Sequence, residues 1–170
     1  MEPEIIESGQ MTIVGMTFYG DPFKDVKDWS SENEIGKIWA RFSKVWDARK
    51  AEIANVLDHD AGYEVHYEPE EYKETKNFYV TVGVEVSEVG VVPLELSFKV
   101  LPATTYAVFK LKGKEIASNW PDRIYKEWMP GSGYEEAHKF LIECYGPTFK
   151  GPDDPESELV IRVPVRRKAG

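Results

Sequence analysis

Cysteine is almost absent from this sequence, because Cys144 is the only one among 170 residues. A single cysteine cannot form an internal disulfide or a cysteine-rich metal site, and this scarcity is typical of proteins in the reducing cytoplasm. Long apolar runs are also lacking, since no stretch approaches the roughly 18 residues that a membrane span needs. The N-terminus, MEPEIIESGQ, is acidic where a secretory signal is basic. These absences predict a soluble, cytoplasmic protein with no membrane partner.

Basic residues are in the minority, with 21 Lys and Arg against 30 Asp and Glu, so the formal net charge is −9. This charge repels phosphate backbones and favours cationic partners, which argues against a nucleic-acid partner. The sequence has no P-loop, dinucleotide-binding fingerprint or nucleophile elbow, so we expect no cofactor. His59 and His138 have no partners at metal-ligand spacing, so we also expect no metal.

The first half of the chain has the pattern of a strand, a helix and two strands. Residues 11–18 form a β-like run before a turn, and residues 63–67 and 78–86 alternate in the manner of strands. Ser31 and Glu34 have the spacing of a capping box, which predicts the start of the helix between them. The apolar residues of this helix recur at spacings of three and four: Ile35, Ile38, Trp39, Phe42, Val45 and Trp46.

The second half repeats that order. Residues 94–111 contain two strand-like runs with a bend at Pro102, and Asn119 followed by Pro121 predicts the start of a second helix. The last two strands are expected over residues 140–145 and 159–165.

This recurrence predicts a single α+β domain over residues 1–170, with related halves at about 10–90 and 94–165. A chain of this length can bury roughly two-thirds of the surface that it exposes when unfolded, which is enough for one substantial core.

Several segments are similar to the GyrI-like proteins: LPATTYAVFKLKG, YKEWMPGSGYE, IECYGP and DDPESELVIRVPV in the second half, and more loosely NFYVTVGVEV in the first. The chain thus resembles the effector-binding domain of AraC-type and multidrug-sensing transcription regulators, which also occurs in stand-alone form. The resemblance implies two strand-helix-strand-strand modules related by a pseudo-twofold axis. It further implies antiparallel sheets with helices on one side and a central ligand cleft on the other.

The resemblance also implies a function. Proteins with this domain bind hydrophobic, often cationic, small molecules in an aromatic pocket that contains an acidic residue. Some stand-alone members resemble hydrolases that open the cyclopropane of DNA-alkylating natural products. A helix-turn-helix unit would need roughly 50 further residues, so we expect a stand-alone domain and not a complete transcription regulator.

The strand over residues 140–145 carries the first candidate site residue. Alternation puts Phe140, Ile142 and Cys144 on one face, toward the core, and leaves Glu143 and Tyr145 on the other. The acidic position implied by the resemblance falls on Glu143.

Aligning Pro69 with Pro147 then matches Tyr63 and Tyr67 to the positions of Leu141 and Tyr145. This alignment predicts a pocket lined by Glu143, Tyr145, Tyr63 and Tyr67. It also predicts that only one half supplies charge, since Glu143 is matched to Val65.

Each candidate also has a plainer interpretation. Glu143 could be solvated or paired with Arg162, and the tyrosines could be ordinary sheet-face aromatics. Trp39 and Trp128 occupy equivalent helical positions and could be core residues instead of ligand contacts. Tyr79 and Tyr106 are further candidates for the pocket.

Two other residues are expected to take no part in the site. His66 faces away from Tyr67 by alternation, so we expect it at the surface or in an interface. Cys144 is expected to be a buried small hydrophobic residue and not a nucleophile.

Two functions remain open from the sequence. The first is a receptor for lipophilic cations, in which aromatic faces and one buried carboxylate hold the ligand. The second is a hydrolase, in which Glu143 is the general base and Tyr67 or Tyr145 donates a hydrogen bond. The expected partner is a small molecule in both cases, and the chain could be a monomer or a homodimer. A third role, inhibition of a topoisomerase, rests on the family name alone.

Overall fold

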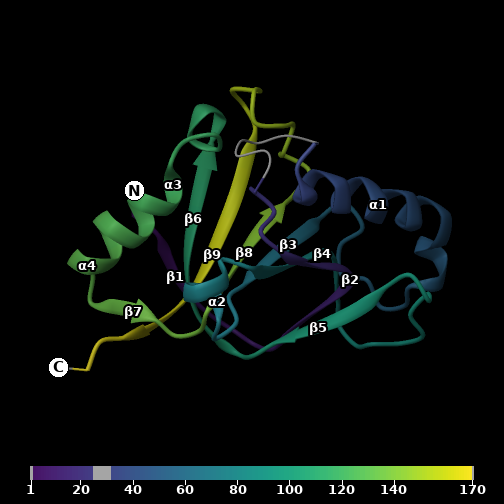
Figure 1. Ribbon diagram of the computed structural model, residues 1–170, viewed down its shortest axis with the longest axis horizontal. Coiled ribbons are helices and arrows are strands. Elements are labelled where there is room, and N and C mark those ends of the chain that lie inside the picture. The colour runs from purple at the N-terminus through teal and green to yellow at the C-terminus, as the bar shows by residue number, and fades with distance from the viewer. Residues whose placement is uncertain (1, 25–31, 170) are drawn as a thin grey trace.

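The computed structural model describes residues 2–24 and 32–169. Its strands form one antiparallel sheet (Figure 1). The strands are β1 (Glu4–Ser8), β2 (Met11–Gly20), β3 (Gly62–Tyr67), β4 (Phe78–Val86), β5 (Ser97–Leu101), β6 (Thr104–Lys112), β7 (Tyr134–Glu136), β8 (Phe140–Tyr145) and β9 (Glu158–Arg167). Their order in the sheet is β1-β6-β9-β8-β3-β4-β2-β5, with β7 paired to β9. The α+β class is confirmed, and β4 and β8 have the predicted bounds.

The helices are α1 (Glu34–Arg49), α2 (Tyr72–Thr75), α3 (Trp120–Asp122) and α4 (Met129–Gly131). A π-helical stretch, Arg123–Trp128, joins α3 to α4, so residues 120–131 form one helical segment. Short 3₁₀ turns cover Lys50–Glu52 and Gly113–Glu115.

Helix α1 begins later than the capping box predicted. Ser31 lies outside the described residues, and the cap of α1 is Asn33, whose side-chain oxygen accepts a 2.9 Å hydrogen bond from the backbone N–H of Gly36. Asn33 thereby satisfies one of the N–H groups left free at the start of a helix. The first turn of the second helical segment contains Pro121, as predicted.

The two halves meet at the centre of the sheet, where β3 pairs with β8. Moving outward, the first half continues with β4 and β2, and the second with β9 and β6. Beyond these, the leading strands cross over: β1 pairs with β6 of the second half, and β5 pairs with β2 of the first. The sequence-based prediction missed β1, because its five residues read only as an acidic N-terminus. The exchange ties each half to the other at both edges of the sheet.

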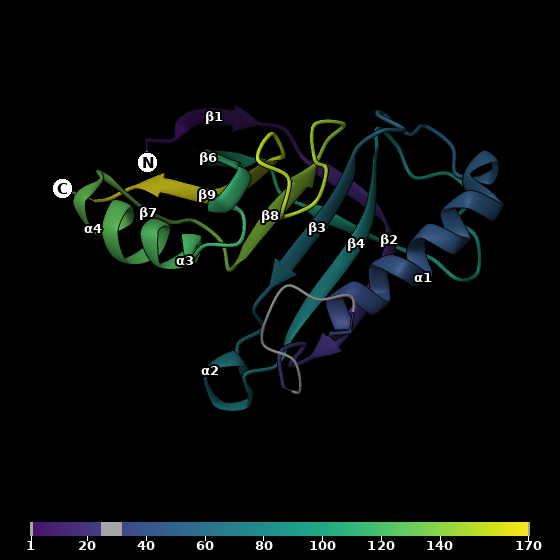
Figure 2. The same cartoon turned by 90° about the horizontal axis from the view of Figure 1, so that it is seen from above.

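Both long helical segments cover the same face of the sheet, one over each half (Figure 2). Helix α1 packs through Ile38 and Phe42 on the apolar residues of β4. Residues 120–131 pack through Trp120 and Ile124 on β6 and β9. A third core cluster lies on the opposite face, and it includes Ile13, Val65, Leu101, Tyr106 and Ile142.

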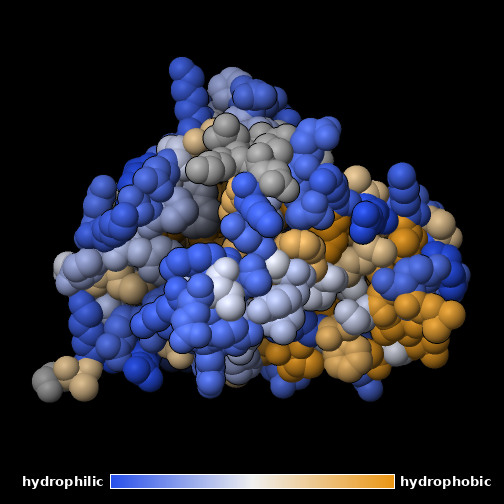
Figure 3. All heavy atoms as spheres, in the orientation of Figure 1, coloured by the Kyte–Doolittle hydropathy of each residue, from blue (hydrophilic) through white to orange (hydrophobic). Residues whose placement is uncertain are grey.

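The surface is mostly polar, but hydrophobic residues gather toward the end of the molecule that carries β5 (Figure 3). The most exposed of them are Val91 and Leu94, with Leu57 and Phe98 less so. In the part of the chain that the structure describes, no helix is long and apolar enough to cross a membrane.

Two facing glycines, Gly15 on β2 and Gly83 on β4, predict a strong effect of adding a methyl group. A Cβ atom on Gly83 would lie 2.1 Å from the carbonyl oxygen of Val14, which is backbone and cannot move aside. We expect Gly83→Ala to destabilise the fold by about 2–4 kcal/mol in urea denaturation. Gly9→Ala is the matched control, since no atom lies within 4 Å of its added Cβ. Equal stability of the two variants would contradict this packing.

Candidate functional site

Two carboxylates face each other at the centre of the sheet. Glu64 on β3 and Glu143 on β8 are directly paired in the antiparallel register. Their side chains are only 3% and 7% exposed, respectively. Two buried acids side by side are costly unless hydrogen bonds or opposite charges compensate them, so this pair marks a candidate site.

The register of β3 determines which side chains join the pair. Directly opposite residues of antiparallel strands share a face, so Glu64 lies on the same face as Val82 of β4, beneath α1. Gly62 and His66 share this face by alternation. Gly62 leaves room for the ring of Trp39, since an added Cβ would lie 2.9 Å from that ring.

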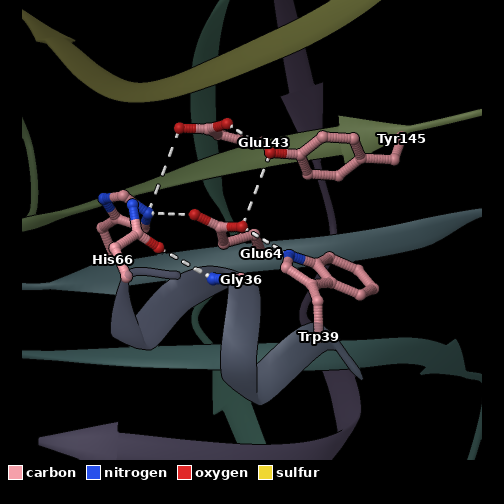
Figure 4. Close-up of polar contacts among 7 residues, drawn as sticks. Gly36, Trp39, Glu64, His66, Glu143 and Tyr145 are labelled. Atoms are coloured by element: carbon pink, nitrogen blue, oxygen red, sulfur yellow. Dashed lines mark hydrogen bonds and ion pairs between the residues drawn. The ribbon is translucent and has the colours of Figure 1, made fainter. Parts of the chain in front are cut away.

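Each carboxylate receives a hydrogen bond from an aromatic side chain (Figure 4). The indole N–H of Trp39 donates to Glu64 Oε2 at 2.6 Å. The hydroxyl of Tyr145 donates to Glu143 Oε2 at 2.7 Å and lies 3.5 Å from Glu64 Oε2. The two rings are in edge contact, with centroids 5.4 Å apart. These donors fix the orientation of both carboxylates.

His66 completes the cluster from the other side. Its Nε2 atom lies 2.5 Å from Glu64 Oε1 and 4.0 Å from Glu143 Oε1. The Oε1 atoms of both glutamates therefore point toward the imidazole, whereas their Oε2 atoms point toward Trp39 and Tyr145. We call Glu64, His66 and Glu143 the acid cluster.

The environment of the acid cluster shifts its proton affinities. Burial raises the pKa of Glu143 to about 7, and the nearby charge of Glu64 adds to this rise, while His66 and the Tyr145 hydroxyl oppose it. Burial lowers the pKa of His66, but the hydrogen bond to Glu64 and the two glutamate charges outweigh it, so the pKa is raised. Burial and the carboxylates hold the pKa of Tyr145 well above its usual value, so its hydroxyl remains a donor.

The acid cluster has the residue types of a metal site, with one potential ligand atom from each residue within 4.8 Å of the others. Ligands of one ion at metal–ligand distances of about 2.0–2.2 Å lie roughly 3 Å apart or more. His66 Nε2 and Glu64 Oε1 are 2.5 Å apart, which is a hydrogen-bond distance. These two atoms are therefore hydrogen-bonded to each other, and we do not assign the three residues as ligands of one metal ion.

A cavity of about 290 Å³ adjoins the acid cluster, and His66 forms part of its wall. Much of the remaining wall is aromatic, contributed by Phe23, Tyr72, Phe78 and Tyr125. Glu64 and Glu143 are not part of the wall, so they lie behind His66 as seen from the cavity. This volume is near the lower end of small-molecule pockets.

The prediction that Glu143 and Tyr145 share a face and lie together holds in the structure. Trp39 also reaches the cluster, through its indole N–H. Trp128 does not share this role, because it packs on Phe109 and Tyr134 under the second helical segment. Cys144 packs with the opposite-face core, as predicted.

The predicted position of four tyrosines relative to Glu143 is wrong. Tyr63 is paired with Cys144 and Tyr67 with Phe140, so both lie on the face opposite Glu143. Tyr79 pairs with Tyr67 and shares that face, and Tyr106 is buried in the core cluster there. In place of these four tyrosines, Glu64 and His66 lie beside Glu143.

The error came from aligning Pro69 with Pro147, which shifts residue numbers by 78. A twofold axis perpendicular to the sheet leaves each side chain on its own face. Directly paired residues of β3 and β8 share a face, and their residue numbers differ by odd values, such as 79 for Glu64 and Glu143. An even shift moves every side chain to the other face. An odd shift of 79 would have matched Glu64 to Glu143, so the sequence contained this signal.

Two further expectations change, and so does one of the alternative interpretations of Glu143. His66 is not a surface residue, because its side chain is 18% exposed and bonded to Glu64. Arg162 does not pair with Glu143, because it is opposite Ile142 on the other face. The carboxylates lie on the helix-covered face, not on the side away from the helices.

A second cavity, of about 620 Å³, includes Tyr67 and Lys99, whose amine lies 4.3 Å from the centre of the Tyr67 ring.

Comparison with known proteins defines the class of this domain as effector-binding. The family model of the integron-associated effector binding protein, Cass2, matches residues 4–165, so the chain belongs to that family. This confirms the resemblance to GyrI-like effector-binding domains and makes small-molecule binding the function class. The transcriptional regulator BrlR of Pseudomonas aeruginosa is 29% identical over 167 residues, which are 97% of this chain and 56% of BrlR. The chain therefore spans about half the length of that relative.

Solved structures share the fold at low sequence identity. SAV2435, solved bound to tetraphenylphosphonium, is 14% identical with a TM-score of 0.71, covering 98% of this chain and 94% of its own. A hydrolase encoded by lin2189 from Listeria innocua is 13% identical with a TM-score of 0.59, covering 97% of this chain and 92% of its own. At these identities the likeness confirms the fold alone.

The raised pKa of Glu143 predicts a pH-dependent stability. Between about pH 4.5 and 7, folded Glu143 keeps a proton that the unfolded chain has lost, so the free energy of unfolding falls as pH rises. Glu143→Gln removes this loss. We expect urea denaturation to give similar stabilities at pH 5, and a variant more stable by about 2 kcal/mol at pH 8. The exposed Glu88→Gln is the control. If the free energy of unfolding changed with pH in the same way in wild type and in Glu143→Gln, burial of this carboxyl would be contradicted.

Proposed function

We propose that this domain binds lipophilic cations, with Glu64 and Glu143 as the anionic anchor. The observation that carries the proposal is the pair of buried, facing carboxylates that lie behind His66, next to a cavity with several aromatic residues in its wall. A charged group in a poorly hydrated site interacts strongly with an opposite charge, and two such groups tolerate several ligand geometries. We place this receptor in the cytoplasm, where a single free cysteine is usual.

The protonation of the pair supports a cation as the ligand. Because its pKa is raised to about 7, Glu143 is protonated in some molecules and charged in others at neutral pH. Two adjacent buried charges repel each other, and a proton on Glu143 relieves this repulsion. A bound organic cation relieves the same repulsion without a proton. The site therefore gains affinity for a cation as Glu143 ionises.

The aromatic residues supply the second part of the recognition. Trp39 and Tyr145 present rings beside the carboxylates, and Phe23, Tyr72, Phe78 and Tyr125 line the cavity. Aromatic faces attract cations through their quadrupoles and bury apolar ligand surface without a strict hydrogen-bond geometry. The net charge of −9 adds a general attraction for cations. The ligand named for SAV2435, tetraphenylphosphonium, has this chemistry.

Calorimetric titration with tetraphenylphosphonium tests the proposal. We expect wild type to bind, and Glu143→Gln to bind roughly 10-fold or more weakly at pH 8, where the wild-type carboxyl is ionised. At pH 6 the two proteins should bind similarly, because Glu143 is then mostly protonated. Glu64→Gln is expected to weaken binding at both pH values.

Glu88→Gln is the control, since this exposed glutamate lies outside the acid cluster and the cavity. The proposal is wrong if wild type does not bind the probe, or if Glu64→Gln and Glu143→Gln bind it as wild type does at pH 8.

Hydrolysis of a strained, cyclopropane-bearing alkylating compound is a second candidate. The observation that favours it is the combination of Glu143, with a pKa near 7, and the 2.7 Å hydrogen bond from Tyr145. A carboxylate with such a pKa is a competent general base, and a positioned hydroxyl stabilises developing negative charge. In this reaction Glu143 takes a proton from water as the water oxygen bonds to a cyclopropane carbon. The electron pair of the broken ring bond goes to a carbonyl group conjugated with the ring in the substrate, whose oxygen takes up a proton. Glu143 gives its proton back, so the carboxylate is restored.

Chromatography of the ring-opened product distinguishes catalysis from binding. If the domain is a hydrolase, wild type accelerates loss of the alkylating compound over buffer, and Glu143→Gln lowers the rate by roughly 100-fold or more. Glu88→Gln should keep the wild-type rate. A wild-type rate no greater than that in buffer would leave only the receptor function.

A further inference from the structure

His66 stands between the cavity and the two carboxylates. Of the three residues of the acid cluster, it is the one that lines the cavity. Its side chain is 18% exposed, against 3% for Glu64 and 7% for Glu143. A ligand in the cavity therefore meets the imidazole before it meets either carboxylate.

The geometry gives His66 the position of a cation. Its Nε2 atom is 2.5 Å from Glu64 Oε1 and 4.0 Å from Glu143 Oε1, so one nitrogen faces an oxygen of each acid. Protonated imidazole donates through both ring nitrogens, whereas carboxylates only accept. The ring of Phe78 on β4 lies 5.4 Å from the imidazole, which adds an aromatic neighbour.

The charged groups around His66 favour its protonated form. On its own strand it faces Glu64, and across on β8 it faces Glu143. The cavity wall that it shares also contains five charged side chains: Asp21, Glu68, Lys76, Glu136 and Lys139. Of these, Lys139 is paired with Glu136. The direction of the shift agrees, since the pKa of His66 is raised in spite of its burial.

We propose that His66 is the internal counter-cation of the binding site, and that a lipophilic cation reaches Glu64 and Glu143 by displacing it. The displaced imidazolium loses its N–H proton to solvent, and the neutral ring moves away from the carboxylates. This inference rests on the proposed function, because it assigns the exchange to the same anionic anchor. His66 is thus a residue that sets affinity and its pH dependence, not an attractive contact for the ligand.

The exchange has an unusual consequence: removing His66 strengthens binding. At pH 6 the wild-type ligand must replace a hydrogen-bonded imidazolium, whereas His66→Gln presents no cation to replace. Charge-assisted hydrogen bonds are strong enough that we expect His66→Gln to bind tetraphenylphosphonium roughly 10-fold more tightly at pH 6. Loss of the imidazole proton removes the internal cation, so the gain should be smaller at pH 8.5 than at pH 6.

Titration of both proteins with tetraphenylphosphonium at pH 6 and pH 8.5 measures this difference. The matched control is His138→Gln, which removes a histidine that stacks on Phe140 and does not line the cavity beside the acid cluster. It should bind as wild type does at both pH values. Circular dichroism and thermal melting of each variant verify the fold.

Proton release provides a second measurement that needs no stable His66 variant. Calorimetry at pH 7 in phosphate and in imidazole buffer, which differ in ionisation enthalpy, counts the protons released per ligand bound. At this pH a displaced imidazole with its ordinary pKa is mostly neutral, so we expect proton release from wild type that persists in Glu143→Gln. His66→Gln should release fewer protons than wild type, since only Glu143 then supplies them.

Several outcomes overturn the inference. One is a folded His66→Gln that binds as wild type does, or more weakly, at pH 6. Another is proton release that disappears in Glu143→Gln, since the proton would then come from Glu143. These results leave the receptor function intact, because wild type still binds the probe. If wild type does not bind the probe at either pH, the proposed function itself fails.

Discussion

The burial of two carboxylates opposite each other is the constraint on which the rest of this site depends. Glu64 and Glu143 lie on adjacent central strands with almost no solvent, where their mutual repulsion is weakly screened. The fold compensates them from both sides, with N–H and O–H donors from Trp39 and Tyr145 on one side and the imidazole of His66 on the other. The charges and hydrogen bonds of these five residues, which come from distant parts of the chain, therefore depend on one another.

The pseudo-symmetry of the fold explains why the charges meet. Strands β3 and β8 are the inner edges of the two halves, so their pairing brings equivalent positions together at the axis. Symmetry holds for the carboxylates but not for their surroundings. Gly62, which admits the Trp39 ring, is paired with Tyr145, whose hydroxyl reaches both acids, and His66 lies at the opposite end of the carboxylate pair. The backbone around the axis is symmetric but the side chains are not, and the cavity lies at the end of the carboxylate pair that His66 occupies.

Local patterns in the sequence predicted most of the elements but only part of the site. Alternation identified β4, β8 and the shared face of Glu143 and Tyr145, because each depends on neighbouring residues alone. The partners of Glu143 depend on the register between two strands about 80 residues apart, which no local pattern determines. The even shift of residue numbers between the two halves wrongly put Tyr63 and Tyr67 beside Glu143, in place of Glu64 and His66. The crossing of β1 and β5 is likewise a property of the whole sheet.

The two faces of the sheet offer opposite environments, and this contrast gives the most direct test. The helix-covered face holds the acid cluster, whereas the other face has Lys99 above the ring of Tyr67 beside the larger cavity. A crystal structure with tetraphenylphosphonium should place the phosphorus beside Glu64 and Glu143, with His66 turned away from both. A ligand bound instead beside Tyr67 and Lys99, with the acid cluster unchanged, would contradict the central role of the facing carboxylates.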